Sequence, residues 1–368
     1  MRKKKIMHIV EGFGGGVYSF LVDLCNNSTE KYDVILVYSK RPQTPEDFKK
    51  DFKAEVKLIQ LNMNRNISLI NDTKNLFEII KIIKSNKPDI VHLHSSKAGV
   101  LGRVAGRFLG YNKENLFYNP HGYSFLQQNV SSRKKYLYFI IEKFMSKVCG
   151  TVISVSKGEH EETLKFTKNA KRVDNAINEK AIKGHIKENT RLGENMVIGT
   201  IGRICFQKNP TLFNDIAAYF NDIKFIWIGD GELREEITSK NIEVTGWCKR
   251  EEVIEKLNEI DLYIQTSLWE GLPIALLEAM YMGKVPIVTN VIGNKDVIVN
   301  GENGFLVDDI EGFKNSVNYM LKNPDKYKNM SRNATYFIEN NHLLSNMING
   351  YYEIYDMVPL YEKIISNN

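Results

Sequence analysis

Short apolar runs alternate with longer amphipathic stretches over most of the chain. The runs in the first half that are typical of buried strands are Ile6–Val10, Asp33–Tyr38, Val56–Leu61, Ile90–His94, Leu116–Tyr118 and Thr151–Val155. The helical patterns between them are Val17–Cys25, Asn71–Ile83, Lys97–Phe108 and Lys134–Met145. Strands of a parallel sheet are covered on both faces, so they read as continuous runs of Val, Ile and Leu. The pattern therefore predicts a doubly wound α/β fold.

Residues 171–195 are less hydrophobic and interrupt this rhythm. The second series of strand-like runs is Val197–Ile201, Phe225–Ile228, Ile242–Val244, Leu262–Gln265, Pro286–Thr289 and Phe305–Val307. We predict two Rossmann-like domains, residues 1–175 and 176–345. The tail, residues 346–368, is predicted to be a helix that packs back on the first domain, because its apolar residues do not suit a free end. Open α/β sheets bind ligands at the carboxyl ends of their strands, so we expect the site in the cleft between the domains.

Size and composition agree with two folded domains: the chain has 368 residues and 43% of them are hydrophobic, which excludes disorder. The cysteines are Cys25, Cys149, Cys205 and Cys248. None forms a C-x-x-C pair, so free thiols in a reducing cytoplasm are expected. The first apolar run stops at Glu11, too short for a signal peptide, and no segment approaches the ~20 apolar residues of a membrane helix. We expect a soluble, cytoplasmic protein.

The charge is distributed unequally along the chain. Residues 1–170 carry 28 Lys and Arg against 16 Asp and Glu, and the remainder carries 22 against 28, which together give the net charge of +6. A basic first half suggests an anionic partner. Nucleic acid, a phosphorylated acceptor and the anionic inner leaflet of a membrane are the candidates, beside the simpler interpretation of a solvated lysine-rich surface.

The strongest motif runs from Trp269 to Met280, directly after the strand-like run Leu262–Gln265. Pro273 suits the first turn of a helix, because it lacks the N–H that would be unsatisfied there. Glu270 then lies on the loop before the helix and Glu278 inside it. A helix N-terminus attracts a diphosphate, which would let one carboxylate reach sugar hydroxyls and the other ribose hydroxyls. The alternative is an amphipathic helix with two incidental glutamates.

Three further segments place polar groups or glycines at the ends of predicted strands. The run Val197–Ile201 continues into Gly202, Arg203 and Lys208, and Asn209-Pro210 then begins a helix. Two cations beside a leaving diphosphate would stabilise the charge that develops on it. Asn119-Pro120-His121-Gly122 follows another strand. The loop Glu11–Val17 contains Gly15 and Gly16, which allow close approach of a ligand to the backbone.

With these motifs the sequence resembles the family-4 retaining glycosyltransferases of the GT-B type that assemble bacterial capsules and other polysaccharides. The hallmark Glu-x7-Glu is matched by Glu270 and Glu278, and the resemblance spans essentially the whole chain. It implies that Glu270 contacts the donor sugar and Glu278 the nucleotide ribose. It also implies that Arg203 and Lys208 hold the diphosphate, and that His121 approaches the transferred sugar without serving as a general base.

The resemblance implies further donor-binding positions. The residues concerned are Gly15 and Gly16, whose N–H groups would approach the phosphates, Gly271, Leu272 and Pro273 beside Glu270, Gly229 in a Gly-x-Gly turn, and Trp247 in a base-recognising segment. The segment Val291–Asp296 departs from the usual Gly-Gly-x-x-Glu, which leaves its contact open. His92–Gly99 resembles an acceptor-side segment of polysaccharide-assembly members.

No metal or other cofactor is expected. GT-A glycosyltransferases hold a divalent ion with Asp-x-Asp, and the nearest approach here, Asp308-Asp309, lacks the spacer. His92 and His94 have no evident third ligand, so they are a poor metal site. Because Arg203 and Lys208 would replace the ion, EDTA should not abolish activity.

We therefore expect the retaining transfer of a hexose or acetamido-hexose from a nucleotide sugar, with UDP as the expected nucleotide, to a polyprenyl-diphosphate-linked glycan. The protein would work at the inner face of the plasma membrane, and no nucleic-acid partner is expected. One alternative is a GT-B protein that has lost catalysis and serves as a binding subunit of another transferase. A nicotinamide oxidoreductase is disfavoured, because Val17 stands where G-x-G-x-x-G needs its third glycine.

Overall fold

The computed structural model describes residues 2–64, 68–186 and 196–360, and the chain divides into two units. The described residues of the first unit fall within Met1–Leu126, Val130–Asp174 and Met347–Asn368. Those of the second fall within Gln127–Asn129 and Asn175–Asn346. Each unit is built around one sheet, and each is described here by itself.

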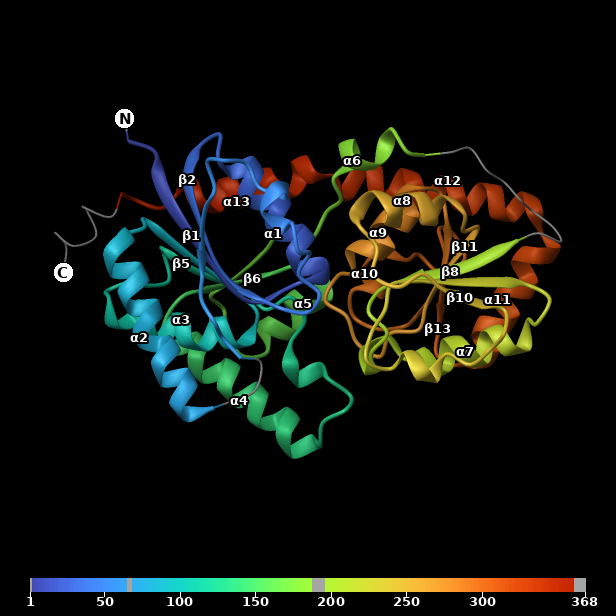
Figure 1. Cartoon of the computed structure of the whole chain (residues 1–368), viewed down its shortest axis with the longest axis horizontal. Helices are drawn as coiled ribbons and strands as arrows, with labels where there is room; N and C mark the ends of the chain where they lie inside the picture. The colour runs from blue at the N-terminus through green and yellow to red at the C-terminus, as the bar shows by residue number, and fades with distance from the viewer. Residues whose placement is uncertain (1, 65–67, 187–195, 361–368) are drawn as a thin grey trace. The chain divides into compact units, whose positions relative to one another are not determined.

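The N-terminal unit contains a parallel sheet with the strand order β3-β2-β1-β4-β5-β6-β7. Its strands are β1 (Lys4–Phe13), β2 (Tyr32–Lys40), β3 (Lys57–Gln60), β4 (Ile90–His94), β5 (Leu116–Asn119), β6 (Thr151–Ser154) and β7 (Ala170–Arg172). Its helices are α1 (Gly15–Ser28), α2 (Leu69–Asn86), α3 (Ser96–Phe108), α4 (Ser132–Val148), α5 (Lys157–Leu164) and most of α13 (Leu344–Asp356). Figure 1 shows α2, α3 and α4 on one face of this sheet and α1 and α13 on the other.

The C-terminal unit repeats this plan with the parallel order β10-β9-β8-β11-β12-β13. Its strands are β8 (Val197–Ile201), β9 (Lys224–Ile228), β10 (Ile242–Val244), β11 (Leu262–Gln265), β12 (Val285–Thr289) and β13 (Phe305–Val307). Its helices are α6 (Glu179–Lys183), α7 (Pro210–Tyr219), α8 (Arg250–Asn258), α9 (Ile274–Tyr281), α10 (Asn294–Val297), α11 (Ile310–Lys322) and α12 (Pro324–Asn341). In Figure 1, α7 and α11 lie on one side of the sheet and α8 and α9 on the other.

The central strands are buried on both faces, which explains why their sequences are continuously apolar. In β1, Ile6, Met7, Ile9 and Val10 are fully buried. All of the strands predicted from the sequence are present, and the predicted doubly wound α/β fold is confirmed. The short edge strand β7 was not predicted, because Ala170–Arg172 carries little apolar signal and depends on pairing with β6.

Two helix boundaries differ from the predictions. Pro273 is the N-cap of α9 rather than a residue of its first turn, and the helix begins at Ile274. The tail helix ends at Asp356, shortly before Pro359, which cannot continue a helix and restricts the residue before it. Residues 361–368 of the predicted tail lie outside the described part. No helix in the described ranges combines the length and apolar character needed to cross a membrane.

Candidate active site

Each sheet has a topological switch point, where successive connections leave in opposite directions. In the C-terminal sheet this point lies between the neighbouring strands β8 and β11. In the N-terminal sheet it lies between β1 and β4. Ligands of open α/β sheets bind beside such points, at the carboxyl ends of the strands. Apart from Trp247, which follows the outer strand β10, the residues selected from the sequence follow these strands or their immediate neighbours.

In the C-terminal unit, hydrogen bonds join the loop after β8 to the loop after β11. The Gln207 carbonyl accepts from the N–H of Leu268 at 2.8 Å, and the Gln207 side chain donates to the Trp269 carbonyl at 2.8 Å. The Thr266 hydroxyl donates to the Lys208 carbonyl at 2.6 Å. These bonds hold Lys208 beside the Glu270 loop. Gln207 was not selected from the sequence, where a lone Gln in a loop gives no signal.

Both glutamates of the Glu-x7-Glu motif are buried and paired with a basic side chain. Lys208 Nζ lies 2.6 Å from Glu270 Oε1. Glu278 forms an ion pair with Arg250, the first residue of α8. Sequence analysis did not identify Arg250, because its pairing with Glu278 depends on how α8 and α9 pack. Arg203, the other predicted cation, is partly exposed and lies 3.7 Å from Glu232.

The N-terminus of α9 lies in the same loop cluster. Its first N–H groups, on Ile274 and Ala275, form no hydrogen bond with any described residue, and both residues are partly exposed. The first turn contains no acidic side chain that would neutralise its partial positive charge. The loop cluster thus combines free backbone donors with the Lys208 ammonium, and this combination suits an anionic ligand.

Two glycines, Gly229 and Gly293, pack closely against the backbone of the loops after β8 and β11. A Cβ on Gly229 would lie 2.3 Å from the Gly202 carbonyl, and Gly229 has a φ of +136°. A Cβ on Gly293 would lie 2.5 Å from the Gly271 carbonyl, at a φ of +85°. Gly293 belongs to the Val291–Asp296 segment, so that segment contacts the Glu270 loop although it lacks the usual glycine pair.

Of the remaining predicted donor-binding residues of this unit, Gly229 follows β9 and Trp247 follows the neighbouring strand β10. Gly229 forms an isolated antiparallel bridge with Gly246, and its N–H donates to the Thr245 hydroxyl at 3.1 Å. The adjacent Trp247 side chain is 57% exposed. The structure therefore brings Gly229 next to the Thr245–Trp247 segment and leaves an aromatic ring accessible there.

In the N-terminal unit, the loop after β1 leads into α1, which begins at Gly15. Gly15 has a φ of +54°, and a Cβ on Gly15 or Gly16 would meet no atom within 4 Å. The space in front of both glycines is therefore open. Their role at a ligand stays a prediction.

His121 follows β5 in a strained turn, with a φ of +55°, and Gly122 has a φ of +93°. The turn is held by Glu159 of α5, which is fully buried and accepts from the Gly122 N–H at 2.7 Å and the Val155 N–H at 2.9 Å. Sequence analysis did not select Glu159. In the sequence, Glu159 belongs to the capping pattern Ser156-x-x-Glu159. That pattern predicts the start of a helix and does not predict a contact beside His121.

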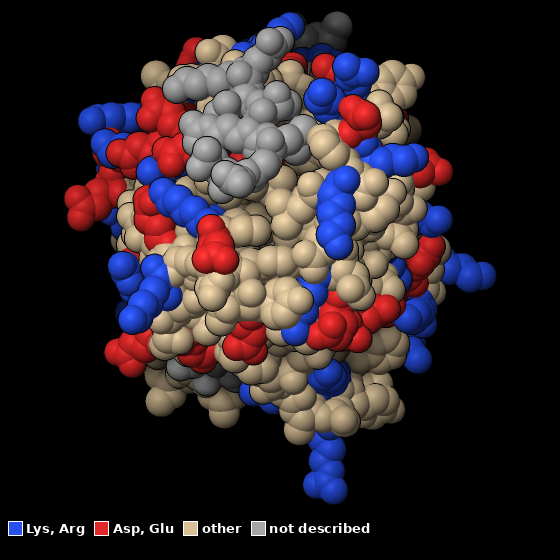
Figure 2. Space-filling model, turned by 90° about the vertical axis from the view of Figure 1, so that its right-hand side faces the viewer, with Lys and Arg blue, Asp and Glu red and all other residues tan. Residues whose placement is uncertain are grey.

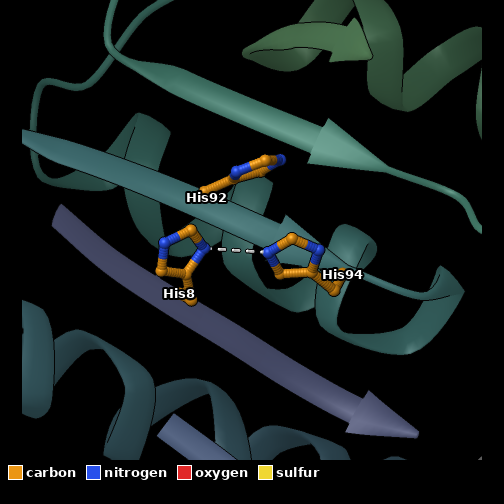
Figure 3. A group of neighbouring side chains, drawn as sticks. All are labelled: His8, His92 and His94. Atoms are coloured by element: carbon orange, nitrogen blue, oxygen red, sulfur yellow. Dashed lines mark hydrogen bonds between the residues drawn. The ribbon is translucent and has the colours of Figure 1, made fainter. Parts of the chain in front are cut away.

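Three buried histidines, His8, His92 and His94, lie close together (Figure 3), and His94 contacts His121. The β1–β4 register places His8 opposite His92, and His94 follows on the same face of β4. His8 Nδ1 lies 3.0 Å from His94 Nε2, and His94 Nδ1 lies 3.0 Å from His121 Nε2. Burial lowers the pKa of His8 and His121 to about 3 and also lowers the pKa of His92 and His94. All four imidazoles are therefore neutral near pH 7.

The expectation that His92 and His94 lack a third possible ligand is wrong, because His8 completes a set whose nitrogens lie within 4.8 Å of one another. The nitrogens of His92 already have partners, however. Asn119 Oδ1 accepts from His92 Nε2, and Tyr355 OH donates to His92 Nδ1 at 2.6 Å. The orientation of the Asn119 amide follows from its Nδ2, which donates to the Ile153 carbonyl at 2.8 Å. A metal ion would have to displace these bonds.

The predicted residues thus form two groups. Glu270, Glu278, Lys208, Arg203 and the bridge between Gly229 and Gly246 lie at the switch-point edge of the C-terminal sheet. The second group contains His121, Gly15 and Gly16. These residues lie at the carboxyl ends of the strands of the N-terminal sheet. Whether a ligand contacts both groups at once stays a prediction.

The chain matches two family models in succession. The model described as Glycosyltransferase Family 4 covers residues 14–179, and that described as Glycosyl transferases group 1 covers residues 182–336. An Escherichia coli UDP-Gal:alpha-D-GlcNAc-diphosphoundecaprenol alpha-1,3-galactosyltransferase is 33% identical over 325 residues, 80% of this chain and 82% of that protein. The Staphylococcus aureus capsular polysaccharide biosynthesis glycosyltransferase CapM is 24% identical over 304 residues, 76% and 79% of the two chains.

A similar solved structure is that of Anabaena HepE in complex with UDP and glucose. It matches with a TM-score of 0.78 and 16% identity and covers 96% of this chain and 99% of the other. This likeness shows the GT-B fold, in agreement with the two parallel sheets described above. The sequence matches show the family predicted from the Glu270 and Glu278 motif, and the chain belongs to the family-4 glycosyltransferases of the GT-B fold.

Proposed function

We propose that this glycosyltransferase moves a hexose or acetamido-hexose from a UDP-sugar, with retention, to a lipid-linked glycan in surface polysaccharide biosynthesis. The observation that carries the proposal is the loop cluster at β8 and β11, where the free N–H groups of α9 and the Lys208 ammonium lie together. The names of the E. coli and S. aureus relatives support the acceptor and the pathway, and the UDP complex of HepE supports the donor.

In this proposal the ion pair between Lys208 and Glu270 is the resting state of the site. A diphosphate seated on the N-terminus of α9 would draw Lys208 toward it and free Glu270 for sugar hydroxyls. Lys208 and Arg203 would then stabilise the negative charge that grows on the leaving nucleotide diphosphate. Glu278, held by its ion pair with Arg250, would accept from the ribose hydroxyls.

The test is an activity assay with a panel of nucleotide sugars and a polyprenyl-diphosphate-linked glycan as acceptor. We expect acceptor-dependent release of UDP, a product with the anomeric configuration of the donor, and the same rate with EDTA. Inversion of the anomeric centre would contradict retention. A loss of activity in EDTA that Mg²⁺ restores would contradict the proposed role of the cations. No turnover of any donor would favour the inactive binding subunit.

We also propose that the protein attaches peripherally to the cytoplasmic face of the membrane through the outer face of α4. The exposed apolar side chains of this helix are Tyr136, Leu137, Ile140 and Phe144, whose spacing places them on one stripe. The stripe is flanked by basic side chains. Arg133, Lys143 and Lys147 are exposed, whereas the only acid of the helix, Glu142, is buried against Arg103.

This combination of apolar and basic side chains suits an anionic lipid surface. The face of the C-terminal unit seen in Figure 2 differs, because acidic and basic side chains are interspersed over it. The proposed acceptor is itself anchored in the membrane, so attachment through α4 would bring the enzyme to its substrate.

Sedimentation with vesicles tests the membrane proposal. The protein should bind phosphatidylglycerol vesicles and be released by salt, and the double variant Leu137→Ser/Phe144→Ser should bind at least about tenfold more weakly, since each buried apolar side chain contributes about 1.5–3 kcal/mol. Tyr336→Ser, at an equally exposed aromatic residue of α12, is the matched control and should bind normally. Equal binding of the double variant, or a dimer that the double variant dissolves, would contradict the proposal.

A further inference from the structure

His8, His94 and His121 form a continuous chain of hydrogen bonds from the middle of the sheet to its edge. Both links measure 3.0 Å, His8 Nδ1 to His94 Nε2 and His94 Nδ1 to His121 Nε2. Figure 3 shows the first link, with the two rings facing each other across β1 and β4. A neutral imidazole has one N–H donor and one bare nitrogen. The position of the proton on one ring therefore determines its position on the other two.

Two proton arrangements satisfy both links. In the first, every ring carries its proton on Nδ1, and His8 Nε2 is a bare acceptor. In the second, every ring carries its proton on Nε2, and His8 holds an N–H with nothing to accept it. His8 Nε2 is buried and has no hydrogen-bond partner among the described residues. Buried N–H groups without an acceptor are rarer in proteins than unsatisfied acceptors, so the first arrangement is favoured.

We propose that His94 and His8 are positioning residues that keep His121 neutral with its proton on Nδ1. His121 Nε2 is occupied by His94, so the partly exposed residue has its hydrogen-bond donor on Nδ1. The His121 ring also packs edge-on against the Phe20 ring, with 4.8 Å between the two ring centroids, and this contact restricts the rotation of the imidazole. The inference rests on the proposed function in one respect, because the oxygen that receives this bond would belong to the transferred sugar. An imidazole in this state donates a hydrogen bond and does not take a proton from the acceptor hydroxyl.

The chain offers a matched control in His92. Its ring is as buried as that of His94, and the two ring centres are 4.2 Å apart. His92 is hydrogen-bonded to Asn119 and Tyr355, and not to His8, His94 or His121. The Asn119 carbonyl oxygen requires the proton of His92 on Nε2, which is the opposite tautomer. One protein thus contains both predicted states.

Long-range ¹H–¹⁵N correlation spectra of the full chain labelled in histidine can test the proposal without any substrate. Single His→Gln variants at positions 8, 92, 94 and 121 would assign the signals. At pH 7 we expect protons on Nδ1 of His8, His94 and His121 and on Nε2 of His92. A proton on Nε2 of His121, a doubly protonated His121, or stoichiometric zinc in the purified protein would overturn the proposal.

Activity provides the second readout. His94→Leu should shift the His121 nitrogen signals and lower kcat roughly tenfold or more, as expected when the outer partner of a functional imidazole is lost. His92→Leu should leave the His121 signals in place and lower kcat less. If the native enzyme turned over no nucleotide sugar, the proposed function would fail while the spectra still decided the tautomer. If it were active with His121 protonated on Nε2, the positioning role alone would fail.

Discussion

The two units share one topology but prepare their switch-point edges in different ways. In the C-terminal unit the side chains of the proposed site are charged and form ion pairs, Lys208 with Glu270 and Glu278 with Arg250. In the N-terminal unit they are neutral imidazoles joined by hydrogen bonds beneath the surface. Charged groups can respond to an incoming diphosphate, whereas a buried neutral network holds one group in a fixed state. Under the proposed function, the N-terminal unit would hold the transferred sugar in one orientation, and the C-terminal unit would stabilise the negative charge that develops on the leaving diphosphate.

The largest expected effect tests the charged half of this comparison. Lys208→Ala should cost about 2–4 kcal/mol of transition-state stabilisation, because one preorganised cation is lost. This loss is measured as a decrease in kcat/KM. Lys224→Ala, which removes a half-exposed ion pair with Glu243 in the same unit, is the control and should be close to native. Steady-state kinetics with the active donor measure both. An unchanged rate in Lys208→Ala would remove this residue from the phosphate site.

A second substitution tests whether the loops after β8 and β9 require the close backbone contact between Gly202 and Gly229. Gly229→Ala should lower the free energy of unfolding by about 2–4 kcal/mol, because a Cβ would meet the Gly202 carbonyl in a backbone conformation that already disfavours side chains. Gly301→Ala shares the positive φ but meets nothing within 4 Å, so it should cost only about 1–2 kcal/mol. Urea unfolding compares the two. Equal losses would show that strain, and not close packing, explains Gly229.

The two glutamates can be separated by kinetics. Glu278→Ala should raise the KM for the donor about tenfold or more, since a charged acceptor for ribose hydroxyls is lost. Glu270→Ala should mainly lower kcat, because the proposed ligand of Glu270 is the sugar that reacts. Initial rates over a range of donor concentrations distinguish these outcomes. The assignment would be contradicted if both variants had near-native constants.

The last prediction concerns the buried histidines of the N-terminal unit and the stability of the fold in acid. The folded-state pKa of His8 is about 3, below the ~6.5 of an unfolded chain, so the unfolded state binds more protons between these values. Stability is therefore complete above about pH 6.5 and falls as the pH drops toward 3, by up to about 1.4 kcal/mol per pH unit for each such histidine. His8→Asn should flatten this slope, measured by urea unfolding from pH 7.5 to 4.5. Parallel curves for the two proteins over that range would show that His8 does not contribute.

The sequence was most informative where function depends on a local pattern. The strands were found because buried parallel strands are continuously apolar, and the Glu270–Glu278 spacing is contained in one loop and helix. Contacts between distant residues were missed. His8 and His94 are separated by 86 positions and meet only because β1 and β4 are neighbours in the sheet. Arg250 and Glu159 were missed for the same reason, since each acquires its partner through the packing of two helices or loops.

Glu159 links two parts of the N-terminal unit that are far apart in sequence. One of its carboxylate oxygens accepts from Gly122 beside His121, and the other accepts from Val155 at the start of the α5 connection. Separating the two loops would remove hydrogen bonds from the buried Glu159 carboxylate, which is energetically unfavourable. If the proposed contact between the transferred sugar and His121 holds, a displacement of His121 would also displace the start of α5. Random substitutions that relax specificity for the sugar should accordingly appear in the α5 connection as well as beside the bound ligand.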